Sequence, residues 1–228
     1  MNTQRRATLI RALRTRSPQM NQCLQQVKKD GMRNGKRPDF VWYFLLQSSA
    51  TLGNSRGWQG LIGTPANYRR VTWEVLEGLS PTRRLLTLQE TLRAAKVRMP
   101  DQKASRLDRN FETIVALGGL AAVRRAALGQ VGTTAKIRFM QQFAGIGDKY
   151  GRNIWMDMYD PDFRQTIAID ERIKTFSREL GVKFRTYDEH EAFYQDVAQE
   201  AGIDGWDLDR LLYNFRDDLL RSIKTVAP

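Results

Sequence analysis

Apolar residues recur at the three- and four-residue spacing of helices along nearly the whole chain, and the two-residue alternation of strands is brief wherever it occurs. The strongest apolar run, residues 40–46, reads FVWYFLL and is apolar enough for a buried core. We predict an all-α fold of about ten short helices, with Asp39 capping the helix that begins at Phe40. The expected helices cover residues 3–16 and 20–29, a segment beginning at 40, about 67–78, 81–96, 101–116, 118–128 and 134–143, two segments that follow the turn at 144–147 and the loop at 160–168, and finally 188–201 and 207–223.

Glycine and proline mark the expected breaks between these helices. Ser17-Pro18 ends the first helix. The stretch 31–38 (GMRNGKRP) is the strongest candidate for a linker, because it combines two glycines, a proline and three bases. The Gly-rich stretch 53–65 is expected to be a loop.

Composition excludes several classes of protein. With 41% apolar residues among 228, the chain can form a buried core, and it has no apolar run near the ~20 residues of a membrane span. The N-terminus lacks the apolar segment of a signal peptide. One cysteine and one histidine exclude an intramolecular disulfide, a zinc finger and an all-cysteine iron–sulfur cluster. We therefore expect a reduced, intracellular protein.

The net charge of +12 is unevenly distributed along the chain. Residues 1–37 carry +9, residues 38–159 carry +8, and residues 160–228 carry −5. A positive field attracts polyanions, so nucleic acid is the leading partner, although basic helix faces are also common in proteins that bind none. The Arg-rich N-terminus also fits a mitochondrial transit peptide. Because the basic run extends past Lys36, we favour a pair of DNA-facing helices and a location in the cytoplasm or nucleoid.

The most informative motif lies in residues 134–180. A helix leads into Ala144-Gly145-Ile146-Gly147, and a second helix begins near Asp148. The two glycines permit a sharp turn, and the exposed N–H groups of Gly145, Ile146 and Gly147 at the start of the second helix form a site for a phosphodiester. A plain αα-hairpin would show the same glycines.

Three side chains of the following helix strengthen the case for phosphate binding. Lys149 lies in its first turn, and Arg152 and Asn153 share a helix face with it. Downstream, Ile167-Ala168-Ile169 leads to Asp170, which could cap the next helix and still offer one carboxylate oxygen. The alternatives are a solvated lysine and a simple capping aspartate.

The segment FAGIGDK at residues 143–149, followed 21 residues later by Asp170 in IAID, resembles the helix–hairpin–helix Gly/Pro…Asp DNA glycosylase superfamily. The endonuclease III and 8-oxoguanine glycosylase branches are the most similar. The resemblance covers about 45 residues, with a weaker match at residues 44–51 (FLLQSSAT). The chain departs from the pattern in having Phe143 and Ala144 where the family has leucine and proline, a slightly long spacer before Asp170, and no iron–sulfur loop.

This resemblance implies roles for individual residues. Lys149 falls at the position of the nucleophilic lysine of bifunctional members, and Asp170 falls on the catalytic aspartate. A neutral lysine amine attacks C1′ of the sugar as the base leaves, and the resulting imine permits β-elimination of the 3′ phosphate. Arg152 would assist the hairpin in binding phosphate. The implied activity is excision of a damaged base, with 8-oxoguanine slightly ahead of oxidised pyrimidines, followed by strand cleavage at the abasic site.

The resemblance also implies an architecture of two lobes with the active site in the cleft between them. Basic helices at 1–39 would pack with the C-terminal lobe at 158–228, and residues 40–157 would form a helical barrel ending in the hairpin at 134–157. The expected partner is double-stranded DNA with a damaged base or abasic site, bound by a monomer. We expect no redox or organic cofactor and no metal ligands among the side chains, although family members often hold an ion at the hairpin carbonyls.

The pocket for the base is less well defined. Candidates for contacting the base or probing the duplex are Gln47, Ser49, Asn54, Asn153, Trp206, Asp209 and Tyr213. An aromatic shelf with an acidic acceptor would suit an N–H-rich purine, while packing or a solvated face is the alternative for each residue. Two other functions stay open: a non-catalytic DNA-binding protein that uses the hairpin as a phosphate clamp, and a glycosylase for an alkylated, deaminated or otherwise modified base.

Overall fold

The computed structural model describes residues 3–51 and 56–224, and within these ranges it contains helices and no strands. This result confirms the all-α prediction. The described residues form fifteen α-helices and one 3₁₀ helix, more than the ten or so expected. Two predicted helices are broken in two, and two short helices lie in predicted loops. No helix among the described residues has the length and apolar character needed to cross a membrane.

The chain divides into two compact units. Met1–Gly35 and Trp155–Pro228 form the first, here called the terminal unit, and Lys36–Ile154 form the second, the central unit. The terminal unit contains α1 (Thr3–Arg14), α2 (Pro18–Gly35), η1 (Pro161–Phe163), α12 (Glu171–Leu180), α13 (Tyr187–Ala201), α14 (Gly205–Asn214) and α15 (Arg216–Lys224). The central unit contains α3 (Phe40–Ala50), α4 (Arg56–Leu61), α5 (Pro65–Arg70), α6 (Trp73–Glu77), α7 (Pro81–Ala94), α8 (Pro100–Ala116), α9 (Gly119–Leu128) and α10 (Thr133–Gln141). The boundary at Ile154 lies within α11 (Asp148–Asp157).

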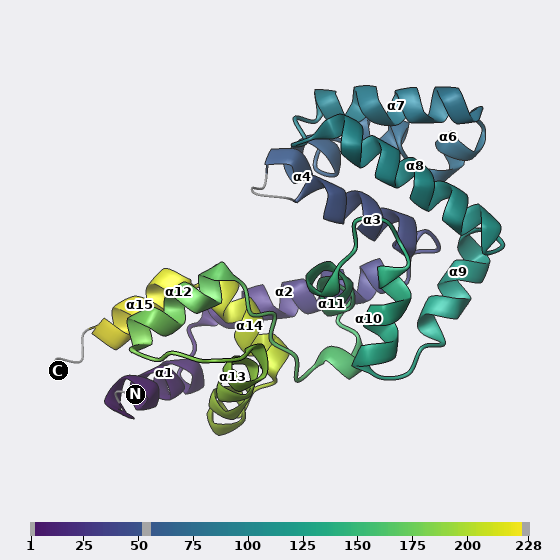
Figure 1. Ribbon diagram of the computed structural model, residues 1–228. Helices are drawn as coiled ribbons and strands as arrows, with labels where there is room; N and C mark the ends of the chain where they lie inside the picture. The colour runs from purple at the N-terminus through teal and green to yellow at the C-terminus, as the bar shows by residue number, and fades with distance from the viewer. Residues whose placement is uncertain (1–2, 52–55, 225–228) are drawn as a thin grey trace. The chain divides into compact units, whose positions relative to one another are not determined.

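In the terminal unit, α1 packs against α13 and α15, and α14 packs against α2 and α13 (Figure 1). Leu9 and Leu13 of α1 are fully buried. The Ser177 hydroxyl lies 2.6 Å from Nε2 of His190 and 2.8 Å from the Tyr194 hydroxyl. Burial lowers the pKa of His190 and raises that of Tyr194. His190 is therefore part of a core hydrogen-bond network.

Several bases of the first two helices pair with acidic parts of the same unit. Arg6 forms a two-point ion pair with Glu200, Arg14 donates to the Glu200 carbonyl, and Lys28 pairs with Asp207. The prediction of a DNA-facing basic helix pair is wrong for these residues, because their charges hold α1 and α2 against the C-terminal helices.

The core of the central unit is aromatic. In α3, residues 40–46 are all buried, as the sequence predicts. Trp42 makes edge contacts with Trp73 and Phe111, and it donates from Nε1 to the Val71 carbonyl. Helices α7 and α8 pack side by side (Figure 1), and α8 contributes Phe111 to this cluster. Arg84 of α7 is buried between them and pairs with Asp108 and Glu112 of α8.

Two segments predicted as irregular are helical instead. Helix α2 continues to Gly35, and α4 occupies residues 56–61 of the predicted loop at 53–65, while residues 53–55 lie outside the described part. The glycines serve close packing here. A Cβ at Gly31 would lie 3.0 Å from the Asp157 carbonyl oxygen, and one at Gly60 would lie 2.2 Å from that of Ala95.

Two long predicted helices are each broken. The predicted helix at 67–78 is α5 and α6, separated at Val71 and the extended residue Thr72. The predicted helix at 207–223 is α14 and α15, separated at Phe215. The expected cap at Asp39 is also absent, because the Asp39 carboxylate accepts from the Arg37 guanidinium instead of the helix N–H groups. Core packing and a local ion pair override the periodic pattern at these positions.

Candidate functional site

A tight hairpin joins α10 to α11 in the central unit. The Phe143 N–H donates to the Met140 carbonyl, and the Ile146 N–H donates to the Phe143 carbonyl at 3.1 Å. Gly145 has φ of +89°, a conformation that other residues rarely adopt. The side chains of Phe143 and Ile146 are buried and anchor the turn. The glycine of the motif is therefore required by the backbone.

The exposed backbone donors of this hairpin differ in part from the prediction. Gly145 and Gly147 are exposed, and neither N–H has a hydrogen-bond partner in residues 3–51 and 56–224. Ile146 is buried and its N–H is already bonded to Phe143. The prediction that Ile146 donates to phosphate is wrong, because closing the turn uses its N–H. Two donors, from Gly145 and Gly147, stay available.

Asn110 of α8 holds the hairpin in place, a role the sequence prediction missed. Its Oδ1 accepts from the Ala144 N–H at 2.6 Å, and its Nδ2 donates to the Ala144 carbonyl at 3.1 Å. The side chain is buried. A signal was present: Lys103 and Asn110 occupy positions of the apolar face of α8, together with Leu107 and Ile114. A buried amide at such a position indicates a specific polar partner.

The predicted side chains of α11 follow directly after the hairpin. Lys149 is exposed in the first turn, and Arg152 and Asn153 are half-buried one turn later. Gly151, between them, lies against Ile137 of α10. An exposed amine next to two free backbone N–H groups is an arrangement that can meet a sugar-phosphate backbone.

Two of the predicted duplex-probing residues lie in the last turns of α3. Gln47 and Ser49 are half-buried there, and the Ser49 carbonyl accepts from Nζ of Lys103 at 2.5 Å. Asn54 falls outside the described residues. The end of α3 therefore lies close to α8, the helix that also carries Asn110.

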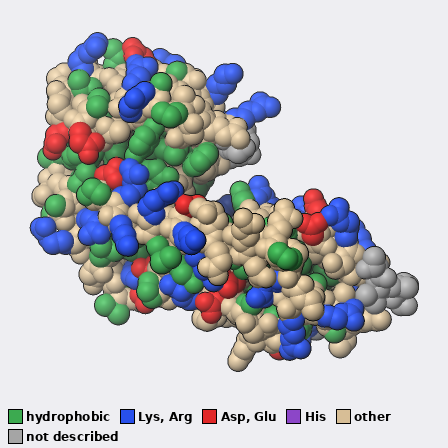
Figure 2. Space-filling model, turned by 180° about the vertical axis from the view of Figure 1, so that it is seen from behind, with side chains coloured by type: hydrophobic (Ala, Val, Ile, Leu, Met, Phe, Trp, Pro, Cys, Tyr) green, Lys and Arg blue, Asp and Glu red, His purple; other side chains and the backbone are tan. Residues whose placement is uncertain are grey.

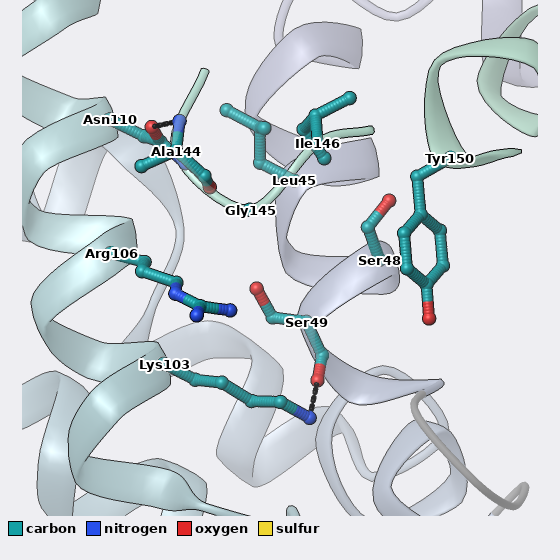
Figure 3. A pocket seen from close by; sticks show the side chains of 10 residues that line it. All are labelled: Leu45, Ser48, Ser49, Lys103, Arg106, Asn110, Ala144, Gly145, Ile146 and Tyr150. Atoms are coloured by element: carbon teal, nitrogen blue, oxygen red, sulfur yellow. Dashed lines mark hydrogen bonds between the residues drawn. The ribbon is translucent and has the colours of Figure 1, made fainter. Parts of the chain in front are cut away.

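A small pocket opens between the end of α3, helix α8 and the hairpin (Figure 3). Its volume is about 60 Å³, and its polar side chains come from Ser48, Ser49, Lys103, Arg106, Asn110 and Tyr150. Lys103 is only 4% exposed. Burial, helped by the charges of Arg106 and Arg98, lowers the pKa of Lys103. Of the predicted site residues, Ser49, Gly145 and Ile146 line this pocket, whereas Lys103, Arg106 and Tyr150 were not predicted.

In the terminal unit, Asp170 caps α12. Its Oδ1 accepts from the N–H groups of Arg172 at 2.9 Å and Ile173 at 3.0 Å, as the sequence predicts. Both cap bonds go to one oxygen, and the residue is half-buried. Oδ2 of Asp170 is therefore not used by the cap.

The three residues before Asp170 are fixed by side chains from α13 and α14. The Ile167 N–H donates to Glu191, the Ala168 N–H to Oδ1 of Asp209, and the Tyr187 hydroxyl donates to the Ile167 carbonyl. Asp209 is 6% exposed, and burial raises its pKa to about 6, with Asp170 and Asp157 acting in the same direction and Arg210 against it. The structure thus gives Asp209 a partner in the segment that leads to Asp170.

The two predicted aromatic pocket residues differ in exposure. Trp206 is fully buried and donates from Nε1 to the Met156 carbonyl at 2.7 Å, so its side chain packs in the core and its predicted role as a shelf for a base is not supported. Tyr213 is 55% exposed, with the Arg172 guanidinium 4.3 Å from its ring centre. Of the two, Tyr213 has the surface needed to stack on a base.

Two hairpin carbonyls take part in hydrogen bonds, and an ion at the hairpin carbonyls stays a prediction. Those of Phe143 and Ala144 already accept hydrogen bonds, from Ile146 and Asn110. Within the part of the chain that the structure describes, no three His, Cys, Asp or Glu side chains cluster as metal ligands.

The predicted catalytic residues belong to different units, Lys149 to the central and Asp170 to the terminal one. Their pairing in one active site therefore stays a prediction. No protein-family model and no curated protein matches this sequence. The fold is similar to the crystal structure of the 8-oxoguanine DNA glycosylase of Thermotoga maritima, with a TM-score of 0.66 and 15% identity over 92% of this chain and 96% of that one. The chain therefore has the all-α fold of a DNA glycosylase.

Proposed function

We propose that the protein is a DNA glycosylase of base excision repair that also cleaves the strand at the abasic site. The observation that carries the proposal is a lysine in the first turn after a hairpin with two free N–H groups, in a chain that has the fold of an 8-oxoguanine DNA glycosylase. Such an enzyme needs a site that binds the DNA backbone and a nucleophile, and we assign these roles to the hairpin and to the lysine.

In the proposed reaction, the hairpin holds a phosphate beside the flipped nucleotide. Flipping is required because a base stacked in a duplex cannot reach an active site. The neutral amine of Lys149 forms a bond to C1′ while the bond to the base breaks, and the base departs with the bonding electron pair and takes up a proton. The imine that forms between Lys149 and the sugar then permits β-elimination of the 3′ phosphate.

Asp170 has a different proposed role. Its free carboxylate oxygen faces the positive charge that develops on the sugar as the base leaves, and a fixed negative charge stabilises that transition state. The cap bonds from Arg172 and Ile173 hold the carboxylate in one orientation. We propose an oxidised base as the substrate, with 8-oxoguanine ahead of oxidised pyrimidines.

Borohydride trapping on abasic and single-lesion duplexes tests the proposal. Wild-type protein should form a covalent adduct, and Lys149→Gln should not. Lys183→Gln removes an exposed lysine from a position outside the proposed site and should trap as wild type. DNA binding without any adduct would instead indicate a non-catalytic clamp.

A panel of duplexes tests the substrate. It includes 8-oxoguanine, an oxidised pyrimidine, uracil and an alkylated purine, each opposite its usual partner. We expect release of 8-oxoguanine to be fastest. Faster release of the alkylated or deaminated base would reject the oxidised-base assignment while leaving the glycosylase assignment intact.

A further inference from the structure

We propose that the pocket between α3, α8 and the hairpin binds a phosphate group. Six polar side chains line it, and none is a carboxylate. They are the cations Lys103 and Arg106, the amide of Asn110, which is bonded to Ala144, and the hydroxyl groups of Ser48, Ser49 and Tyr150. We take the phosphate to be one of the DNA backbone, so the proposal rests on the function proposed above. The pocket would then contact the DNA backbone at a second point, beside the contact made by the hairpin.

The cations of this pocket lack acidic partners. Over residues 3–51 and 56–224, neither Lys103 nor Arg106 forms an ion pair with a carboxylate. Arg84 of the neighbouring helix shows the contrast, because it is paired with two acids. Burying a charge without a partner is costly, so a lysine that is 96% buried calls for an anion or for a structural need. One bond to the Ser49 carbonyl uses one of the three N–H donors of Lys103.

Arg106 links the pocket to the hairpin. A Cβ placed on Gly145 would lie 3.3 Å from Cδ and 3.7 Å from Nη1 of Arg106, so this side chain passes directly over the turn. Figure 3 shows its guanidinium pointing into the space between the hairpin and Ser49. Because Arg106 is itself exposed, its donors can reach a ligand from solvent.

The size of the pocket suits one tetrahedral anion. A cavity needs a volume of about 10–15 Å³ to hold a single water molecule, and the volume of this pocket is about 60 Å³. Guanidinium, ammonium and hydroxyl groups, all of which line this pocket, are the donors that bind phosphate oxygens. A DNA backbone diester and free inorganic phosphate share this chemistry, and the experiment below separates them.

The first arm titrates the free protein with inorganic phosphate and follows backbone amide NMR signals. Saturable shifts at Gly145 and Tyr150 are expected in the wild type and in Arg109→Gln, which removes an exposed arginine of α8 outside the pocket. Arg106→Gln should abolish them. Lys103→Gln, which keeps a donor for the Ser49 carbonyl, should weaken phosphate binding about tenfold. Thermal unfolding confirms that each variant is folded.

The second arm measures affinity for an undamaged duplex as a function of salt. Arg106→Gln should make the slope of log K against log salt shallower by about one, and Arg109→Gln should leave the slope unchanged. Phosphate binding with an unchanged slope supports the pocket with free phosphate as its ligand. Absence of shifts at Gly145 and Tyr150 overturns the proposal. If phosphate binds but no lesion is excised, the pocket stands and the proposed function fails.

Discussion

The buried carboxylate of Asp209, which accepts from the Ala168 N–H two residues before Asp170, makes the stability of the fold depend on pH. Burial raises its pKa to about 6, whereas an unfolded chain gives an aspartate its ordinary value near 3.8. The folded protein therefore binds more protons than the unfolded chain between these values. The contribution of Asp209 to the free energy of unfolding is fully present below about pH 4 and is lost as the pH rises through 6.

Asp209→Asn should remove this pH dependence. The asparagine oxygen can still accept from the Ala168 N–H, and it carries no charge to desolvate. Relative to wild type, the variant should gain stability between pH 4 and pH 8, by roughly 2–3 kcal/mol in total. Urea unfolding at pH 4, 6 and 8 measures the difference. A difference that does not change with pH would contradict the assigned pKa.

Asp170 combines a structural role with a proposed catalytic one, and two substitutions separate them. Asp170→Asn keeps an oxygen that can accept the Arg172 and Ile173 N–H groups, so its stability should stay close to wild type, while Asp170→Ala should lose about 1 kcal/mol. Single-turnover base release by Asp170→Asn should fall on the order of 10²–10³-fold, because a fixed charge is lost, with little change in DNA affinity. Equal losses in binding and release would argue against the catalytic role.

At the scale of elements, the hairpin depends on α8. Asn110→Ala would leave both the N–H and the carbonyl of Ala144 without their partner, at an expected cost of about 1–3 kcal/mol. Because the hairpin would loosen, affinity for abasic DNA should fall as well. Gln130→Ala removes an amide that follows α9 and makes one bond to the Ala126 carbonyl of that helix, away from the hairpin, and should change neither. Chemical unfolding and DNA titration of the two variants give the comparison.

The small helix α4 depends on close approach of the backbone. Gly60→Ala would place a Cβ 2.2 Å from the Ala95 carbonyl oxygen, so α4 must shift, at an expected cost of about 1–3 kcal/mol or more. Gly78→Ala is the matched control, since the nearest atom to its Cβ is 3.7 Å away and its φ is −77°. The melting temperatures of the two variants test this prediction. Similar values would show that α4 can shift to accommodate the Cβ without a loss of stability.

These elements also show what the sequence can predict. Periodicity identified α7, α8 and α13 because each has one long apolar face, and the glycines of the hairpin follow from the local turn. The pattern of apolar and glycine residues predicted breaks at Gly31, Gly57 and Gly60, but the chain is helical there. At these positions the missing side chain lets the helix pack closely against the backbone of another segment. The cap at Asp170 is local and was predicted, whereas the clamp by Asn110 joins positions 34 residues apart and was not.

At the scale of the whole molecule, the positive charge is concentrated in one unit. The central unit has 19 bases and eight acids, a net charge of +11, and the terminal unit has 18 bases and 17 acids, a net charge of +1. Figure 2 shows one face of the molecule, on which Lys and Arg side chains are widely spread.

This asymmetry predicts which exposed bases draw DNA to the protein. Attraction of a polyanion depends on the local field, and the 17 acids of the terminal unit cancel most of the field there. Replacing three exposed arginines of the central unit by glutamine, at Arg98, Arg125 and Arg138, should weaken binding to undamaged duplex at least about tenfold at low salt.

The matched triple variant in the terminal unit replaces Arg11, Lys29 and Lys183, and should weaken duplex binding only about two- to threefold. Both variants remove three exposed charges, so each should unfold within about 0.5 kcal/mol of wild type. Fluorescence anisotropy at several salt concentrations compares them. Equal losses would mean that total charge alone governs association, whereas a larger loss from the central set ties the capture of DNA to the unit that holds the hairpin.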